Sequence, residues 1–228
     1  METTPLRAQI LDTIIRKSTL KQRVFDNTFG AFNSLKETLL EMASEMDDEL
    51  DGKLDRRVRI EYRDRGKFEA QLQVANDILI FQMHTDVFEF GSDHLIWQNP
   101  YVQADRDNSY CGLINIYNFL SDSFKFNRNA DEGYLIGRIF INRERRYFAE
   151  GKQQNSMRAM DFGKSEIGQE ALVAILESAI GFALNFDLLM PPYEENKRVT
   201  VDQFNTKMDN SKFVTGKRLG YDFDVEDI

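Results

Sequence analysis

The sequence feature that most constrains the fold is an alternation of apolar and polar residues within residues 58–83. In residues 58–62 every second residue is apolar, and in residues 68–74 apolar side chains alternate with glutamate and glutamine. A period of two places successive side chains on opposite faces of a β-strand. We therefore predict two half-buried strands, followed by a third that starts near residue 79, in an antiparallel meander.

Turn residues at both ends of the second strand predict how these strands pair. Residues 64–66, DRG, fit a three-residue hairpin loop that places Tyr62 opposite Phe68. Residues 76 and 77, ND, fit a two-residue turn. In this register the apolar faces agree across all three strands, as a buried face requires. The predicted pairs are Val74 with Leu79, Leu72 with Phe81 and Ala70 with Met83 on the core face, and Glu69 with His84 and Lys67 with Asp86 on the polar face.

Helical spacing dominates the remaining apolar segments. Residues 4–50 predict two helices or one kinked helix with a joint near residues 26–30, and residues 113–124 predict a helix of about three turns. Residues 134–152 predict a second hairpin that turns near Arg143 and Glu144, and residues 166–190 an apolar helix that ends at Pro191. The predicted order is ααβββαββα, an α+β fold with an antiparallel sheet packed against helices.

The chain divides into a body and an arm. We expect residues 1–192 to form one α+β domain, with residues 4–50 as its helical N-terminal part. Residues 193–228 are polar with scattered apolar anchors, which indicates a C-terminal arm that is partly extended or disordered. Such anchors bury little surface unless another surface receives them, so the arm is expected to serve partner binding or self-association.

Composition limits the compartment and the partners. The net charge of −9 disfavours general binding to nucleic acids and to anionic membranes, since both are negatively charged. One cysteine, no secretory leader and charged residues within the most apolar segment predict a cytoplasmic protein that does not span a membrane. Two basic clusters, one in residues 57–67 and one in residues 143–146, are interpreted as solvated sheet edges.

The loop after the third strand is the candidate ligand pocket. It contains Asp93 and His94 as polar groups and Trp97 and Tyr101 as apolar walls. Tyr110 and Cys111 follow closely and complete the hypothetical site. The alternative, which we favour, is a loop folded over the end of the core and anchored by its two large aromatic residues. Cys111 is expected to be an inert buried thiol, not a nucleophile.

A metal site is the second hypothesis for this region. The predicted register aligns Glu61, Glu69 and His84 across three strands, and these side chains are acceptable ligands for a divalent metal. An open sheet face supplies neither four closed ligands nor a water-shielded pocket. We therefore favour an ordinary polar sheet face, and we expect no cofactor.

These patterns favour a non-enzymatic module that binds another polypeptide or itself as a homo-oligomer. In element order alone, with helices flanking a meander and a hairpin, the chain resembles the small acidic chaperones of type III secretion and related bacterial proteins. No sequence motif carries that resemblance, and we claim no family from it. The alternative function is an enzyme or small-molecule sensor with a pocket around His94, Trp97, Tyr110 and Cys111.

Overall fold

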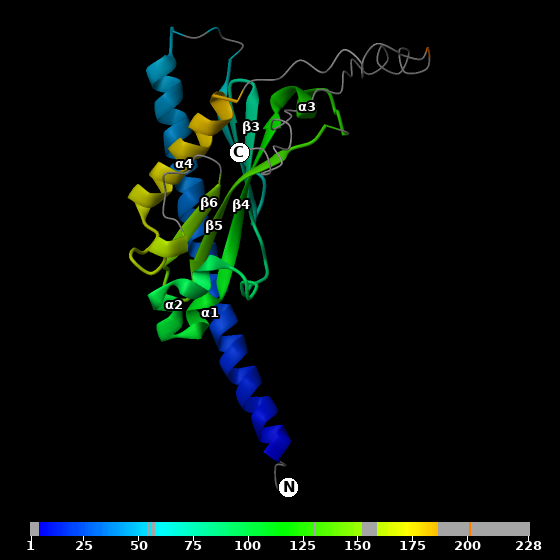
Figure 1. The fold of residues 1–228 in the computed structure, drawn as a ribbon. Helices are drawn as coiled ribbons and strands as arrows, with labels where there is room; N and C mark the ends of the chain where they lie inside the picture. Colours follow the sequence, from blue (N-terminus) through cyan, green and yellow to red (C-terminus); the bar gives the residue numbers. More distant parts are fainter. Residues whose placement is uncertain are drawn as a thin grey trace, which may run out of the picture.

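The chain forms an α+β fold in which one long helix and a C-terminal helix pack against a single antiparallel sheet (Figure 1). The computed structural model describes residues 5–53, 55, 58–129, 131–151, 159–186 and 201. The predicted fold class is therefore confirmed. The elements are α1 (Pro5–Leu50), β1 (Ile60–Asp64), β2 (Glu69–Val74), β3 (Asp77–Met83), η1 (Leu95–Gln98), α2 (Pro100–Ala104), η2 (Arg106–Ser109), β4 (Cys111–Leu120), α3 (Ser121–Lys125), β5 (Tyr134–Asn142), β6 (Tyr147–Gly151), η3 (Ala159–Asp161) and α4 (Gln169–Leu184).

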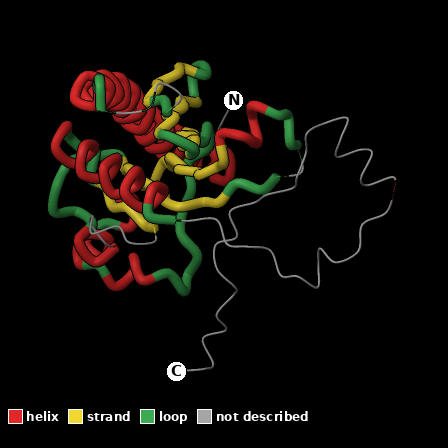
Figure 2. The backbone as a smooth tube through the Cα atoms, turned by 90° about the horizontal axis from the view of Figure 1, so that it is seen from above, coloured by secondary structure: helices red, strands yellow, loops and turns green. Residues whose placement is uncertain are grey.

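The sheet is a six-stranded meander in which each strand pairs with its neighbours in the sequence, in the order β1-β2-β3-β4-β5-β6. One face packs against α1 and α4 and forms the main core, whose largest buried side chains include Phe32, Leu39 and Phe81. Part of the opposite face, over β4–β6, is covered by residues 84–110 and η3. A second cluster forms there around Phe148 and Phe162. Figure 2 shows the sheet between these two sets of helices.

Helix α1 is continuous, so the predicted joint near residues 26–30 is wrong. The apolar stripe passes through this region without a break: Val24 and Phe32 are buried, and the hydroxyl of Thr28 donates to the carbonyl of Val24 at 2.7 Å. Gly112 of β4 lies directly beneath Thr28, because a Cβ on this glycine would be 2.8 Å from the Thr28 Cβ. Close packing against β4 therefore accompanies an uninterrupted helix at residues 26–30, where a joint was predicted.

Residues 111–120 form β4, so the helix predicted over residues 113–124 is also wrong. The strand is central and buried on both faces: Ile114 and Ile116 point into the main core, while Cys111 and Leu113 join the second cluster. A strand with two apolar faces loses the alternation that identifies it, and its apolar residues then fit helical spacing by chance. Helix α3 begins only at Ser121.

The register of the first hairpins keeps the predicted faces but shifts by two residues or more. Leu72 pairs with Leu79 instead of Phe81, and Tyr62 pairs with Leu72 instead of Phe68. The second turn has two residues, as predicted, but it lies one residue earlier, at Ala75 and Asn76, where Ala75 adopts a positive φ of 53°. An even shift preserves which side chains face the core. The predicted core-face residues Ala70, Leu72, Val74, Leu79, Phe81 and Met83 are accordingly all buried in the main core.

The C-terminal half follows the prediction more closely. The second hairpin turns at residues 143–145, as expected, with Ile141 opposite Tyr147. Helix α4 is shorter than predicted and ends at Leu184. Pro191 and, except for residue 201, the predicted arm at residues 193–228 lie outside the described residues. Within the part of the chain that the structure describes, no helix is long and apolar enough to cross a membrane.

Candidate protein-binding surface

The first third of α1 projects beyond the sheet as an isolated helix, as the blue ribbon in Figure 1 shows. Residues 5–19, which we call the stalk, are all exposed, and Leu20 is the first buried residue of the helix. At 1.5 Å per residue the stalk is about 22 Å long. A helix of this length with few tertiary contacts is marginal in water, because most helical stability in proteins comes from packing.

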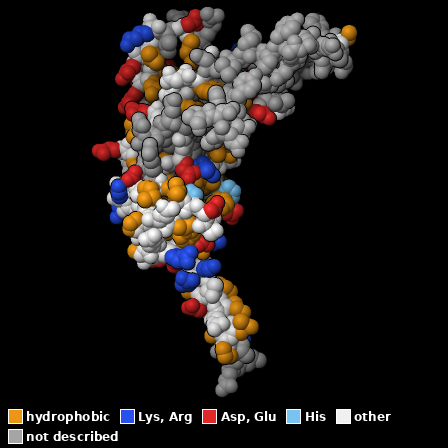
Figure 3. Space-filling model, in the orientation of Figure 1, with side chains coloured by type: hydrophobic (Ala, Val, Ile, Leu, Met, Phe, Trp, Pro, Cys, Tyr) orange, Lys and Arg blue, Asp and Glu red, His pale blue; other side chains and the backbone are white. Residues whose placement is uncertain are grey.

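The stalk carries large aliphatic side chains that nothing in the described structure covers. Figure 3 shows them as an orange band along the projecting helix. This exposure indicates a binding surface, because large contiguous apolar patches on soluble proteins usually mark interaction sites. The exposed side chains are Leu6 (67%), Ile10 (50%), Leu11 (46%), Ile14 (54%) and Ile15 (67%).

Three of these residues extend the stripe that packs on the sheet further along the helix. Leu6, Ile10 and Ile14 follow one another at intervals of four, and at 100° per residue they lie on the side of α1 that Val24 and Phe32 use to reach the core. They continue the apolar stripe of α1 beyond the point where the sheet ends, so the stripe is exposed there. Their helical spacing predicts an apolar helix face, but the sequence does not show where the sheet ends.

Leu11 and Ile15 add a second apolar line that the sequence analysis missed. They point away from the sheet-facing stripe and lie at nearly the same angle around the helix as Leu40, which is 56% exposed. The signal that could have identified them is a helix segment with apolar residues on more than one side, which is the pattern of a helix buried by more than one neighbour.

The charges of α1 are distributed against its own dipole. Its first turn contains no acidic residue and its last turn no basic residue. A helix dipole favours the opposite arrangement, with anions at the N-terminus and cations at the C-terminus. Residues 5–27 carry five basic residues (Arg7, Arg16, Lys17, Lys21 and Arg23) against two acidic ones (Asp12 and Asp26), whereas residues 37–50 carry six acidic residues (Glu37, Glu41, Glu45, Asp47, Asp48 and Glu49) and no basic one.

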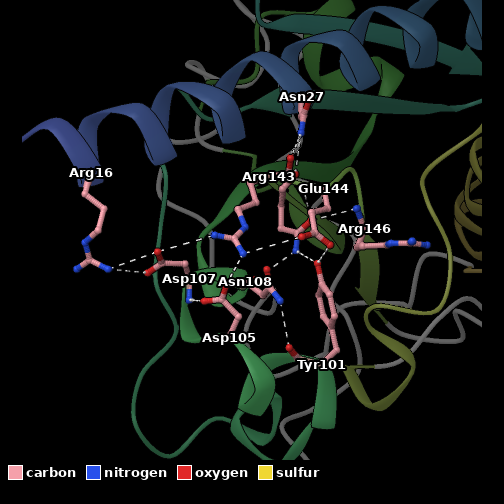
Figure 4. A network of polar contacts seen from close by, with 10 residues as sticks. Arg16, Asn27, Tyr101, Asp105, Asp107, Asn108, Arg143, Glu144 and Arg146 are labelled. Atoms are coloured by element: carbon pink, nitrogen blue, oxygen red, sulfur yellow. Dashed lines mark hydrogen bonds and ion pairs between the residues drawn. The ribbon is translucent and has the colours of Figure 1, made fainter.

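A polar network holds the body together where the stalk leaves it (Figure 4). Its centre is Asn142, a fully buried residue at the end of β5. The Asn142 Oδ1 accepts from the backbone N–H groups of Glu144 and Arg146, at 2.9 and 3.1 Å, and its Nδ2 donates to the Tyr101 hydroxyl at 2.9 Å. Tyr101 in turn donates to Glu144 at 2.7 Å. One side chain thus fixes the β5–β6 turn and ties it to α2.

Ion pairs and amide contacts connect this turn to α1. Arg143 pairs with Asp105, and the Nη1 of Arg16 lies 3.5 Å from Asp107. The hydrogen bond from Arg143 holds the pKa of Asp105 below its usual value. On the other side of the turn, the Asn27 amide donates to the carbonyl of Arg143 at 2.7 Å. Residues distant in the sequence converge here, so these contacts fix the part of the body from which the stalk projects.

His94 and Trp97 of the predicted ligand loop each have a hydrogen-bond partner in the fold. His94 caps η1, with its Nδ1 accepting from the Ile96 N–H at 3.1 Å, and its Nε2 lies 3.2 Å from a carboxylate oxygen of Glu150. The Trp97 indole donates to the Gly91 carbonyl at 2.7 Å. Both side chains have structural roles, as the favoured interpretation of this loop requires. An open cavity of about 560 Å³ borders this loop, and Trp97 lines it whereas His94 does not; its other lining residues are Glu89, Phe90, Ser92, Val102, Gln103 and Arg106.

The other predicted ligand residues are dispersed. Asp93 is exposed, Tyr101 belongs to the Asn142 network, and Tyr110 lies beyond η2. Burial raises the pKa of Tyr101 and of Tyr110. Cys111 is fully buried in the second cluster, and this burial raises the pKa of its thiol, which disfavours the thiolate. The structure does not bring these six residues together around one space.

The three residues of the hypothetical metal site are also separated by the observed register. Glu61 pairs with Gln73, Glu69 pairs with Gln82, and His84 lies one residue beyond the end of β3. The side chain of Gln82 donates to Glu69 at 3.1 Å, so this carboxylate has an ordinary partner. Among the residues described, no group of three or more His, Cys, Asp or Glu side chains could hold a metal ion.

The two basic clusters do not form one patch. The first lies along β1 at one edge of the sheet, while Arg143 and Arg146 lie at the β5–β6 turn, where they face Asp105 and Glu166. The second cluster is thus part of the base of the stalk.

Comparison with known proteins adds no further guide to function: no protein-family model, no curated protein and no solved structure matches the chain significantly.

Proposed function

We propose that the protein is a polypeptide-binding module that pairs with a second copy of itself through α1. The observation that carries the proposal is the exposed apolar surface of the stalk, of which Ile15 and Leu6 are each 67% exposed. Exposed contiguous aliphatic surface on a protruding helix is typical of a surface that another helix covers.

The charge distribution of α1 favours a second copy as the occupant, in antiparallel orientation. Such an arrangement places the N-terminal half of one helix, which has a net positive charge, beside the acidic residues 37–50 of the other. It also opposes the two helix dipoles and supplies each end of α1 with the charges that its own sequence lacks. The same arrangement brings Leu11 and Ile15 of one copy near Leu40 of the other.

The apolar surface is large enough for a weak dimer. Burying a half-exposed aliphatic side chain contributes about 1 kcal/mol, so the five apolar side chains of the two stalks supply at most roughly 10 kcal/mol, of which Leu11 and Ile15 supply roughly 4 kcal/mol. Association costs at least about 4 kcal/mol in lost translational and rotational freedom, before any ordering of the stalk. We expect a dissociation constant in the micromolar to millimolar range, and hence a concentration-dependent oligomer.

Sedimentation equilibrium of the full chain over a wide concentration range tests this proposal. We expect a monomer–dimer equilibrium that Leu11→Asp weakens by at least about tenfold, because each dimer then buries two carboxylates in place of apolar side chains. Gln9→Asp is the matched control, since it introduces the same charge on the opposite side of the exposed stalk from Leu11. A chain that stays monomeric at all concentrations, or equal weakening by both variants, contradicts the proposal.

A further inference from the structure

A groove between β1 and α3 lies outside the surface just described. It is a cavity of about 650 Å³, walled by the side of α3 and floored by the polar face of β2 and the start of β3. We call it the β1–α3 groove. The side chains that decide its chemistry are Arg59, Arg63, Arg65 and Lys125, with the amide of Gln71 and the hydroxyl of Ser121.

The strand period explains why the arginines gather there. Arg59, Arg63 and Arg65 have the same parity, opposite to that of Ile60 and Tyr62, which pack against the main core. Arg63 lies opposite Gln71 in the β1–β2 pair, so both side chains project on the same face. This face is the one that α1 and α4 do not cover. Arg59 precedes β1 by one residue and Arg65 follows it by one residue.

The groove keeps positive charge despite two nearby carboxylates. Glu61 accepts two hydrogen bonds from Arg63, at 2.9 and 3.0 Å, and this lowers the pKa of Glu61. Arg65 makes its contacts with neutral groups: its Nη1 donates to the Gln71 Oε1 at 3.0 Å, and its guanidinium lies 5.4 Å from the ring centre of Phe124. The charge of Arg65 is therefore held in place without being neutralised by an acid.

Lys125 completes the set on the opposite wall. Its ammonium lies 5.1 Å from the centre of the Phe126 ring. Asp122 is the carboxylate of α3 that lines the groove, and it opposes an anionic ligand. The four cations thus face Asp122 and the already paired Glu61, and a net positive groove remains on a protein of net charge −9. Distant carboxylates matter little, since charges are screened within about 8 Å at physiological ionic strength.

We propose that the β1–α3 groove binds a compact anion that carries two or more phosphate groups. Guanidinium groups bind phosphate oxygens through paired hydrogen bonds, and side chains two residues apart on a strand project about 7 Å from each other, so they can hold neighbouring groups of one ligand. The volume suits a small molecule. A long nucleic acid fits less well, because the net charge of the molecule repels an extended phosphate backbone.

Isothermal titration calorimetry of the full chain with inorganic tripolyphosphate at low ionic strength tests the proposal. We expect saturable binding that Arg65→Gln weakens roughly three- to tenfold, as expected for the loss of a half-exposed charge-assisted hydrogen bond. Asp122→Asn should tighten binding, because it removes the repelling carboxylate. Lys164→Gln removes a charge outside the groove, where Lys164 pairs with Asp161, and should leave binding unchanged.

Titrations with two further ligands identify the class of ligand that the groove recognises. Adenosine triphosphate that binds no tighter than tripolyphosphate assigns recognition to the phosphates alone, whereas tighter binding assigns a contribution to the base as well. Citrate, a compact carboxylate of similar charge, should bind more weakly than tripolyphosphate. Absence of saturable binding, or an Asp122→Asn variant that binds no more tightly than the unaltered chain, overturns the proposal. Far-UV circular dichroism of each variant confirms that a change in affinity is not a loss of fold.

Discussion

Replacing Gly112 by alanine should destabilise the protein, because β4 and α1 approach too closely for a side chain there. A Cβ at this position would lie 2.1 Å from the Thr28 Oγ1 and 2.8 Å from the Thr28 Cβ. Thr28 cannot move aside cheaply, since its side chain is fully buried and bonded to the Val24 carbonyl. Overpacking of this kind costs about 1 to 3 kcal/mol, and the lower entropy of the unfolded alanine variant offsets about 0.4 to 1 kcal/mol. We expect a net loss of about 1 to 2 kcal/mol.

Urea unfolding, followed by circular dichroism and by the fluorescence of Trp97, measures this loss as a shift of the midpoint at constant slope. Thr28→Ala should recover part of the stability of the Gly112→Ala variant, because it removes the closest atom of the clash. Gly181→Ala is the control with opposite sign: nothing lies within 4 Å of its added Cβ in α4, so we expect a gain of about 0.5 to 1 kcal/mol. A Gly112→Ala variant as stable as the unaltered chain refutes the packing argument.

Three other predictions concern the base of the stalk and the second cluster. Asn142→Ala should lower the free energy of unfolding by about 2 to 4 kcal/mol in the same urea assay, because several partners of a buried amide lose their hydrogen bonds together. The Cys111 thiol should react with a disulfide reagent only as fast as the protein unfolds, and Cys111→Ser should retain self-association; rapid reaction of the folded chain contradicts this. Arg143 holds the pKa of Asp105 below its ordinary value of 3.8, so this pair should stabilise the fold above that pH and lose its effect as the pH falls through the lowered pKa. Asp105→Asn should therefore reduce the fall of the melting temperature with decreasing pH at acid pH. An unchanged pH dependence would contradict a stabilising role for this pair.

The sequence predicted the elements whose pattern is local. The alternation in residues 68–74 identified β2 and its core face, and helical spacing identified α1 and α4. It failed at β4, where burial on both faces removes the alternation of a half-buried strand. It also misplaced the register of both hairpins, and for β2–β3 the turn lies one residue earlier than predicted, where Ala75 adopts a positive φ.

The candidate surface was predictable only in part. Spacing shows that Leu6, Ile10 and Ile14 belong to an apolar stripe, but whether they are buried depends on where the sheet ends. The base of the stalk gave no signal in the sequence, since Arg16 and Asn142 contact residues far away along the chain. His94 and Trp97 were chosen for their chemistry, and the structure gives them partners within their own loop and on β6.

Site-specific cross-linking most directly tests the central claim that α1 pairs with a second, antiparallel α1. Leu11→Cys and Leu40→Cys, combined in a Cys111→Ser background, place two exposed thiols about 44 Å apart on one helix at 1.5 Å per residue. A short bismaleimide therefore cannot join them within one chain. We predict a cross-linked dimer whose peptides, identified by mass spectrometry, join position 11 of one copy to position 40 of the other. Links only between identical positions, or no link at concentrations where a dimer sediments, would contradict this arrangement.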